Sequence, residues 1–106
     1  MYKIYLAYGS NLNIEQMARR CPTARVLGSA KLRGYKATFR GMEGNAVMNI
    51  EPDAAGIVPV LLWKLEPADE AALDRYEGFP RLYRKEIVTV TFTGARVKAM
   101  VYVMNE

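Results

Sequence analysis

Histidine is absent from the 106 residues, and cysteine occurs only once. Without histidine the chain lacks the commonest general base, the Ser-His and Cys-His pairs that activate nucleophiles, and the usual ligand of zinc sites. The single cysteine, Cys21, excludes an internal disulfide and a thiolate cluster. We interpret it as a small buried hydrophobic residue. Any acid–base chemistry must therefore use a carboxylate, a lysine or a tyrosine.

Long hydrophobic runs are also missing. No apolar stretch approaches the roughly 20 residues that a membrane-spanning helix needs. Lys3 and Ser10 interrupt the short apolar stretch at the N-terminus, so no signal peptide is predicted. With 51% hydrophobic and 25% charged residues, the composition is typical of a soluble globular protein. One domain over residues 1–106, a cytoplasmic location and no membrane contact are therefore expected.

Charge is distributed unevenly along the chain. The net charge is +4, and residues 1–40 carry eight basic groups but one acidic group, Glu15. A basic half of this kind would suit phosphate binding, so a nucleic-acid-binding protein is one interpretation. Most of these Lys and Arg residues, however, alternate with apolar residues, as they do on the solvent-facing side of strands and helices. A solvated surface is the favoured interpretation, and no nucleic-acid partner is predicted.

The pattern of apolar and turn-forming residues predicts an α+β domain. Residues 2–8 are apolar or aromatic at nearly every position, which predicts a strand buried on both sides. Asn13 is an expected N-cap for a helix that ends near Arg20. A second helix is predicted to begin at Pro67 and to end at Gly78. The other predicted strands span residues 31–40, 45–51, 57–65, 82–92 and 96–104, with turns at 41–44, 52–56 and 93–95.

These elements predict a small, mostly antiparallel sheet of six strands that curls toward a barrel, flanked by the two short helices. Curling removes exposed strand edges. Pro59 is tolerated within 57–65 only at an edge or a bulge. Strands 2–8, 57–65, 82–92 and 96–104 are expected to lie in one curled sheet, with the loop from Tyr8 to Leu12 opening into a cavity.

The segment Tyr8-Gly9-Ser10-Asn11-Leu12 is the first candidate site. A glycine turn between a buried strand and a helix presents several unpaired backbone N–H groups at one place. Together with the positive end of the helix dipole, these groups can bind a carboxylate, a phosphate or an oxyanion. The alternative is a tight turn with a purely structural role.

Glu77 is the second candidate. It follows Leu73 by four residues, so it shares the inner face of the predicted helix. It also lies in the last turn, at the negative end of the helix dipole, where a carboxylate is poorly placed. Burial and the dipole would both raise its pKa toward the range that a general base needs. The alternative is a solvated glutamate before the glycine that ends the helix, and Asp74 is interpreted as a surface or local hydrogen-bonding group.

Four of the seven tyrosines, Tyr5, Tyr8, Tyr83 and Tyr102, lie beside apolar residues on predicted strands. A buried tyrosine usually finds a partner for its hydroxyl group. Most of them are therefore interpreted as core residues, and one or two as lining a pocket.

Several segments resemble, in order, those of the γ-glutamylcyclotransferase family, which includes the AIG2-like proteins. The first segment is Tyr5-Leu6-Ala7-Tyr8-Gly9-Ser10-Asn11-Leu12, followed by Met17 and Arg20-Cys21-Pro22. Then come Met48-Asn49-Ile50-Glu51-Pro52, Leu62-Trp63-Lys64-Leu65 and Leu73-Asp74-Arg75-Tyr76-Glu77-Gly78. The resemblance spans nearly the whole chain.

The resemblance implies a small β-barrel flanked by helices and an enzyme that acts on γ-glutamyl amines or amino acids. The free α-amine of the glutamyl group attacks its own γ-carbonyl, which releases 5-oxoproline and a free amine, with no metal or cofactor. It implies Glu77 as the catalytic acid and base. The substrate-binding residues that it implies are Tyr5, Leu6, Ala7, Tyr8, Gly9, Ser10, Asn11, Tyr83 and Tyr102.

Three residues depart from the family pattern. Val60 stands where many relatives have glycine, Pro59 precedes it, and Met48 replaces a smaller residue. The chain also stops at Asn105-Glu106, where relatives often continue into a segment that covers the cleft. These departures concern the pocket, so the amine substrate is not assigned. No oligomeric state is predicted from the sequence. A non-catalytic module of the same fold that binds a small ligand or an anion is the second interpretation.

Overall fold

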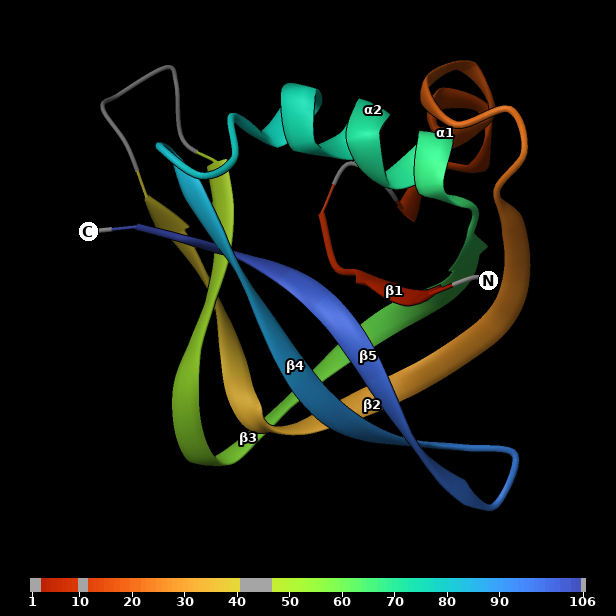
Figure 1. The fold of residues 1–106 in the computed structure, drawn as a ribbon. Helices are drawn as coiled ribbons and strands as arrows, with labels where there is room; N and C mark the ends of the chain where they lie inside the picture. The colour runs from red at the N-terminus through yellow and green to blue at the C-terminus, as the bar shows by residue number, and fades with distance from the viewer. Residues whose placement is uncertain (1–2, 10–11, 41–46, 106) are drawn as a thin grey trace.

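Five strands close into a barrel, and two helices lie together on one side of it (Figure 1). The computed structural model describes residues 3–9, 12–40 and 47–105. In these ranges the elements are β1 (Lys3–Ala7), α1 (Ile14–Arg20), β2 (Arg25–Arg40), β3 (Val47–Leu65), α2 (Pro67–Glu77), β4 (Tyr83–Phe92) and β5 (Ala95–Met104). Around the barrel they follow the order β1-β3-β2-β4-β5. The α+β class and the curled sheet are confirmed.

Closure of the barrel depends on β1. It pairs antiparallel with β3 from Lys3–Leu65 to Ala7–Leu61, and it meets β5 in parallel at Tyr5–Met100. Its side chains alternate between the two faces, as in any strand. Leu6 points into the barrel and Tyr5 toward the helices, and both are buried. The expectation that this strand is buried on both sides is confirmed.

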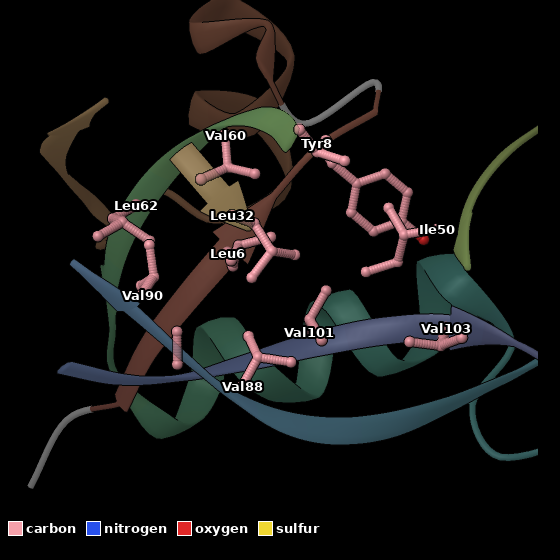
Figure 2. Packing of buried hydrophobic residues seen from close by; sticks show 12 residues of the cluster. Leu6, Tyr8, Leu32, Ile50, Val60, Leu62, Val88, Val90, Val101 and Val103 are labelled. Atoms are coloured by element: carbon pink, nitrogen blue, oxygen red, sulfur yellow. The ribbon is translucent and has the colours of Figure 1, made fainter. Parts of the chain in front are cut away.

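Two clusters of buried side chains follow from this alternation. The first fills the barrel and draws on all five strands; Figure 2 shows Tyr8 and Ile50 at one end of it and Leu62 and Val90 toward the other. The second lies between the sheet and the helices and includes Met17 of α1, Leu73 of α2 and Trp63 of β3. Neither helix has the length and apolar character needed to cross a membrane.

The cap expected for the first helix is confirmed. Asn13 precedes α1, and its side-chain Oδ1 accepts a hydrogen bond from the backbone N–H of Gln16 at 3.1 Å. This bond satisfies one of the N–H groups that the first turn of a helix leaves without a partner.

The count of six strands is wrong. The predicted strands 45–51 and 57–65 form one strand, β3, and the turn expected at 52–56 does not break it. The local turn chemistry is present, because Asp53 Oδ1 accepts a hydrogen bond from the N–H of Ala55 at 3.1 Å. However, β2 pairs with β3 on both sides of this point, from Arg33–Ile57 to Tyr35–Pro52, so the extra residues form a bulge. The expected turn at 41–44 and the start of its strand at Asn45 lie outside the described residues.

The predicted strand 31–40 also begins earlier than expected, at Arg25. Val26 pairs with Trp63, and Ala30 pairs with Val60, so the partner strand extends β2 toward the helices. Pro59 lies just beyond Leu61–Leu65, the stretch of β3 that pairs with β1. Because β1 does not pair with β3 at Pro59, the missing N–H of this proline costs no hydrogen bond to β1.

Gly56 is expected to be required for the bulge. A Cβ atom at this position would lie 2.1 Å from the backbone oxygen of Tyr35, so the strand pair would have to move. We expect Gly56→Ala to lower the free energy of unfolding by about 1–3 kcal/mol, measured by urea denaturation. Ala55→Ser, at an exposed neighbouring position, is the control and should change it by less than about 0.5 kcal/mol. Equal stability of Gly56→Ala and the wild type would contradict the bulge geometry.

Candidate active site

Helix α2 positions Glu77 at its last residue, as the sequence predicted. At the start of the helix, Pro67 occupies the first turn, and Asp69 Oδ2 accepts a hydrogen bond from the Glu66 N–H at 2.9 Å. At its end, Gly78 adopts the left-handed conformation, with φ 71° and ψ 35°. The positive φ favours glycine, so the chain turns away immediately after Glu77.

Glu77 is half-buried, on the same helix face as the fully buried Leu73. Burial raises its pKa from 4.5 to about 7, because the charged form loses hydration, and the nearby charge of Arg20 opposes the shift. Among the described residues, no side-chain hydrogen bond contributes to this pKa. A carboxylate with a pKa near 7 can accept and return a proton at neutral pH.

A cleft of about 540 Å³ lies beside this carboxylate. It is bounded by the end of α2, by the segment that follows it, and by the adjoining ends of β4 and β5. The lining residues are Tyr76, Glu77, Arg81, Leu82, Tyr83, Met104 and Asn105. Its volume is within the range of small-molecule sites.

Two of the predicted tyrosines lie near Glu77. The charge of Glu77 raises the pKa of both Tyr8 and Tyr83, although burial is the larger cause for each. The Tyr83 hydroxyl donates a hydrogen bond to the backbone oxygen of Met48 at 3.4 Å. The Tyr8 hydroxyl donates to the backbone oxygen of Tyr102 at 2.7 Å. The fold thus places the hydroxyl groups of Tyr8 and Tyr83 within the electrostatic influence of the Glu77 carboxylate.

The side chain of Tyr102 is directed elsewhere. It is almost fully buried, packs edge-to-face on Tyr5 with ring centroids 5.8 Å apart, and donates its hydroxyl hydrogen bond to Asp74 Oδ1 at 2.6 Å. Asp74 also pairs with Lys85 at 2.9 Å. Asp74 forms hydrogen bonds, but its partners lie 28 and 11 residues away in sequence, so the local role expected for it is wrong. The Tyr102 side chain belongs to the core beneath α2.

The side chains of the predicted site residues of β1 lie in the core. Tyr5, Leu6 and Ala7 are buried, and their backbones pair with β3. Gly9 follows the strand, and its carbonyl oxygen accepts a hydrogen bond from the N–H of Leu12 at 2.9 Å. Ser10 and Asn11 lie outside the described residues, so the binding role predicted for this loop stays a prediction.

Sequence analysis missed two polar residues of the cleft, Arg81 and Asn105. Asn105 Nδ2 donates to the backbone oxygens of Pro80 and Arg81 at 2.8 and 3.0 Å. Its own N–H donates to the Leu82 oxygen at 2.9 Å. These contacts join parts of the chain more than 20 residues apart, and no local pattern signals them.

Asn49 was also missed as an individual residue. It is buried, and its Oδ1 accepts a hydrogen bond from the Met104 N–H at 2.9 Å, beside the cleft. A polar residue between Met48 and Ile50 on an apolar strand is the signal that could have found it, because a buried amide needs a partner.

Among the residues that the structure describes, neither a reactive thiol nor a metal cluster is indicated at this site. Cys21 is buried, and burial first and Asp69 second raise the pKa of its thiol to about 11. This confirms its interpretation as a buried hydrophobic residue. Over residues 3–9, 12–40 and 47–105, no group of three or more His, Cys, Asp or Glu side chains is arranged to hold a metal ion.

The raised pKa of Glu77 makes stability depend on pH. Since the folded protein holds this proton more tightly than the unfolded chain, stability is lost as the pH rises from 4.5 through 7. Glu77→Gln removes this loss, so we expect the variant to be more stable than the wild type at pH 8 by about 1 kcal/mol, after allowance for solvent screening. The advantage should shrink as the pH falls to 5.

Urea denaturation at pH 5, 6, 7 and 8 measures this dependence. With no histidine in the chain, the α-amino group is the only other group that ordinarily titrates there. Glu86→Gln is the control, because Glu86 forms an ion pair with Arg84 at 2.7 Å, and its removal should not stabilise the protein at high pH. A constant difference between Glu77→Gln and the wild type would show that Glu77 is solvated.

Known proteins share both the sequence pattern and the fold. The family model described as gamma-glutamyl cyclotransferase, AIG2-like, matches residues 5–106. A bovine gamma-glutamylcyclotransferase is 29% identical over 82 residues, which cover 71% of this chain and 44% of the bovine protein. The match therefore spans less than half the length of this curated relative.

Solved structures agree with this match. A structure described as a gamma-glutamyl cyclotransferase superposes with a TM-score of 0.90 at 25% identity, covering 99% of this chain and 68% of the other. An uncharacterized human protein gives 0.89 at 26% identity with the same coverage. A mouse AIG2-like protein shares the fold at 16% identity, with a TM-score of 0.76 over 97% of this chain and 77% of its own. By this match over residues 5–106, the chain belongs to the AIG2-like gamma-glutamyl cyclotransferase family.

Proposed function

We propose that this protein is a γ-glutamyl cyclotransferase, which converts a γ-glutamyl compound into 5-oxoproline and a free amine or amino acid. The observation that carries the proposal is the half-buried Glu77 carboxylate, whose pKa of about 7 suits proton transfer, at the wall of a cleft of about 540 Å³. Family membership and the name of the bovine relative support the same activity.

The reaction needs a base because the α-amine of the substrate is protonated at neutral pH. Glu77 accepts a proton from this ammonium group, and the neutral amine attacks the γ-carbonyl carbon. A C–N bond forms, and the carbonyl oxygen takes up the negative charge of a tetrahedral intermediate. When the C=O bond forms again, the bond to the leaving nitrogen breaks.

Two protons move in all from the attacking nitrogen to the leaving nitrogen, and Glu77 relays them one after the other. Its carboxylate is regenerated at the end of each turnover, so no further reactant is needed. Attack within one molecule closes a five-membered ring, and a correctly oriented substrate therefore supplies much of the rate.

The remaining residues are proposed to bind and orient the substrate. Backbone N–H groups of the loop after Gly9 would hold the glutamyl carboxylate or the developing oxyanion. Tyr83 forms part of the cleft wall. Tyr8 lies close enough to Glu77 for the carboxylate charge to raise the pKa of its hydroxyl group. The proposed partner is a small γ-glutamyl compound, without nucleic acid or membrane, in the cytoplasm.

Glu77→Gln tests the mechanism. The amide keeps the size of the side chain but cannot accept the substrate proton, so we expect 5-oxoproline release to fall by about 10² to 10⁴. Wild-type activity should rise with pH through about 7, the pKa of Glu77, because the base must be ionised. The measurement is 5-oxoproline release from γ-glutamyl dipeptides and γ-glutamylamines between pH 5 and 8.

Glu86→Gln, at a position of β4 that is not among the lining residues of the cleft, should keep both the rate and the pH profile of the wild type. Retained activity of Glu77→Gln would exclude Glu77 as the base. If the wild type binds γ-glutamyl compounds, measured by calorimetry, but releases no 5-oxoproline, the protein is a binding module of the same fold.

Gly9→Ala tests the loop. A Cβ atom at Gly9 would meet Met48 Cβ at 3.8 Å, an ordinary contact, so folding should change little. The added methyl group would stand beside the N–H groups proposed to hold the substrate, and we expect KM to rise several-fold. Urea denaturation and KM are measured together, with Gly56→Ala as the variant expected to affect folding alone. Normal binding by a Gly9→Ala protein that unfolds much more easily would make the loop purely structural.

A further inference from the structure

Arg81 is a cation without a described partner on the wall of the cleft. It is exposed, and of the described residues that line the cleft it alone carries a positive charge. No acidic side chain among the described residues forms an ion pair with its guanidinium group. An arginine of this kind can bind a carboxylate through two parallel hydrogen bonds.

The backbone that carries Arg81 is held in place from both sides. Its carbonyl oxygen and that of Pro80 accept hydrogen bonds from Asn105 Nδ2. The next residue, Leu82, donates its N–H to the Gly78 oxygen at 2.8 Å and accepts from the Asn105 N–H at 2.9 Å. A cation on a fixed segment loses less entropy when it binds a ligand than one on a free loop.

Arg81 and Glu77 both line the cleft, Glu77 at the end of α2 and Arg81 in the segment that follows it. The charge that lowers the pKa of Glu77 is that of Arg20, on α1. Apolar side chains of Leu82 and Met104 complete the wall, and they can contact an uncharged part of the ligand.

We propose that Arg81 binds a carboxylate on the leaving amine, so that the protein selects γ-glutamyl amino acids over γ-glutamylamines that lack an acidic group. This inference rests on the function proposed above and names its substrate class. The glutamyl half of the substrate lies with its α-amine at Glu77, and the leaving half extends along the wall toward Arg81. A cationic amine would meet Arg81 with a like charge and is disfavoured.

A matched pair of substrates tests this selection. γ-Glutamyl-alanine and γ-glutamyl-alaninamide have nearly the same size, but only the first carries a carboxylate on its leaving half. A hydrogen bond to a charged group contributes about 1.5–3 kcal/mol, which corresponds to a preference for the acid of roughly 10- to 100-fold in kcat/KM. This preference should decrease with added salt, because the site is exposed.

Arg81→Gln should bring the ratio of the two kcat/KM values close to one, mainly by raising KM for the acid. Arg81→Lys keeps the charge but loses the paired donors, and an intermediate ratio is expected. Arg96→Gln removes the same charge from β5 next to the 93–95 hairpin and should preserve the wild-type ratio. A wild-type ratio near one, or an unchanged ratio in Arg81→Gln, would overturn the inference while leaving the cyclotransferase proposal intact.

Failure of the proposed function has a different signature. In that case the wild type releases 5-oxoproline from neither compound, and calorimetry with the same two compounds decides the role of Arg81. Tighter binding of the acid that is lost in Arg81→Gln would support the carboxylate site. Equal binding of both compounds, or binding of neither, would overturn it.

Discussion

The contact between β1 and β5 holds the first and last strands of the chain together, and the rest of the structure depends on it. It closes the sheet through a parallel pair at Tyr5–Met100, and the hydrogen bond from Tyr8 to the Tyr102 oxygen secures it at 2.7 Å. Closure removes the exposed edges of the sheet. It also brings Tyr8, which follows β1, into contact with β5, and the adjoining ends of β4 and β5 form one wall of the cleft.

Two carboxylates three residues apart on α2 illustrate how the surroundings decide chemical behaviour. Asp74 accepts the Tyr102 hydroxyl and pairs with Lys85, which also binds Glu70 at 2.6 Å. That network fixes α2 on β4 and β5. Glu77 shares the helix but not the network, and burial raises its pKa to about 7. The helix thus carries one structural acid and one suited to proton transfer.

The position of Glu77 lowers the stability of the folded protein at neutral pH but favours its proposed role as a base. The loss of hydration around the half-buried Glu77 carboxylate disfavours the folded state at neutral pH, yet the same desolvation makes it a better base. Arg20 reduces the shift without abolishing it. Its guanidinium group stacks on the ring of Tyr76 with 3.6 Å to the centroid, so helix α1 contributes to the electrostatics of a residue on α2.

The sequence alone predicted the structural features that depend on residues close together in the chain. The start of α1 follows from Asn13, and the two ends of α2 follow from Pro67 and Gly78. The inward face of Glu77 follows from its spacing to Leu73. The apolar or aromatic residues at nearly every position of 2–8 likewise predicted that β1 is buried on both sides. These features depend on hydrogen bonds and periodicities within a few residues.

The tertiary structure decided whatever depends on residues distant in sequence. Asp53 and Gly56 have the chemistry of a turn, but only the pairing of β2 along both sides turns that segment into a bulge within one strand. The cleft wall likewise requires Asn105 to reach the backbone of Arg81. Distant residues also decided where the tyrosine side chains lie. The hydroxyl of Tyr102 is bound to Asp74, whereas Tyr83 lines the cleft. A strand pattern gives the face of a residue, but the partner on that face is set by how the barrel closes.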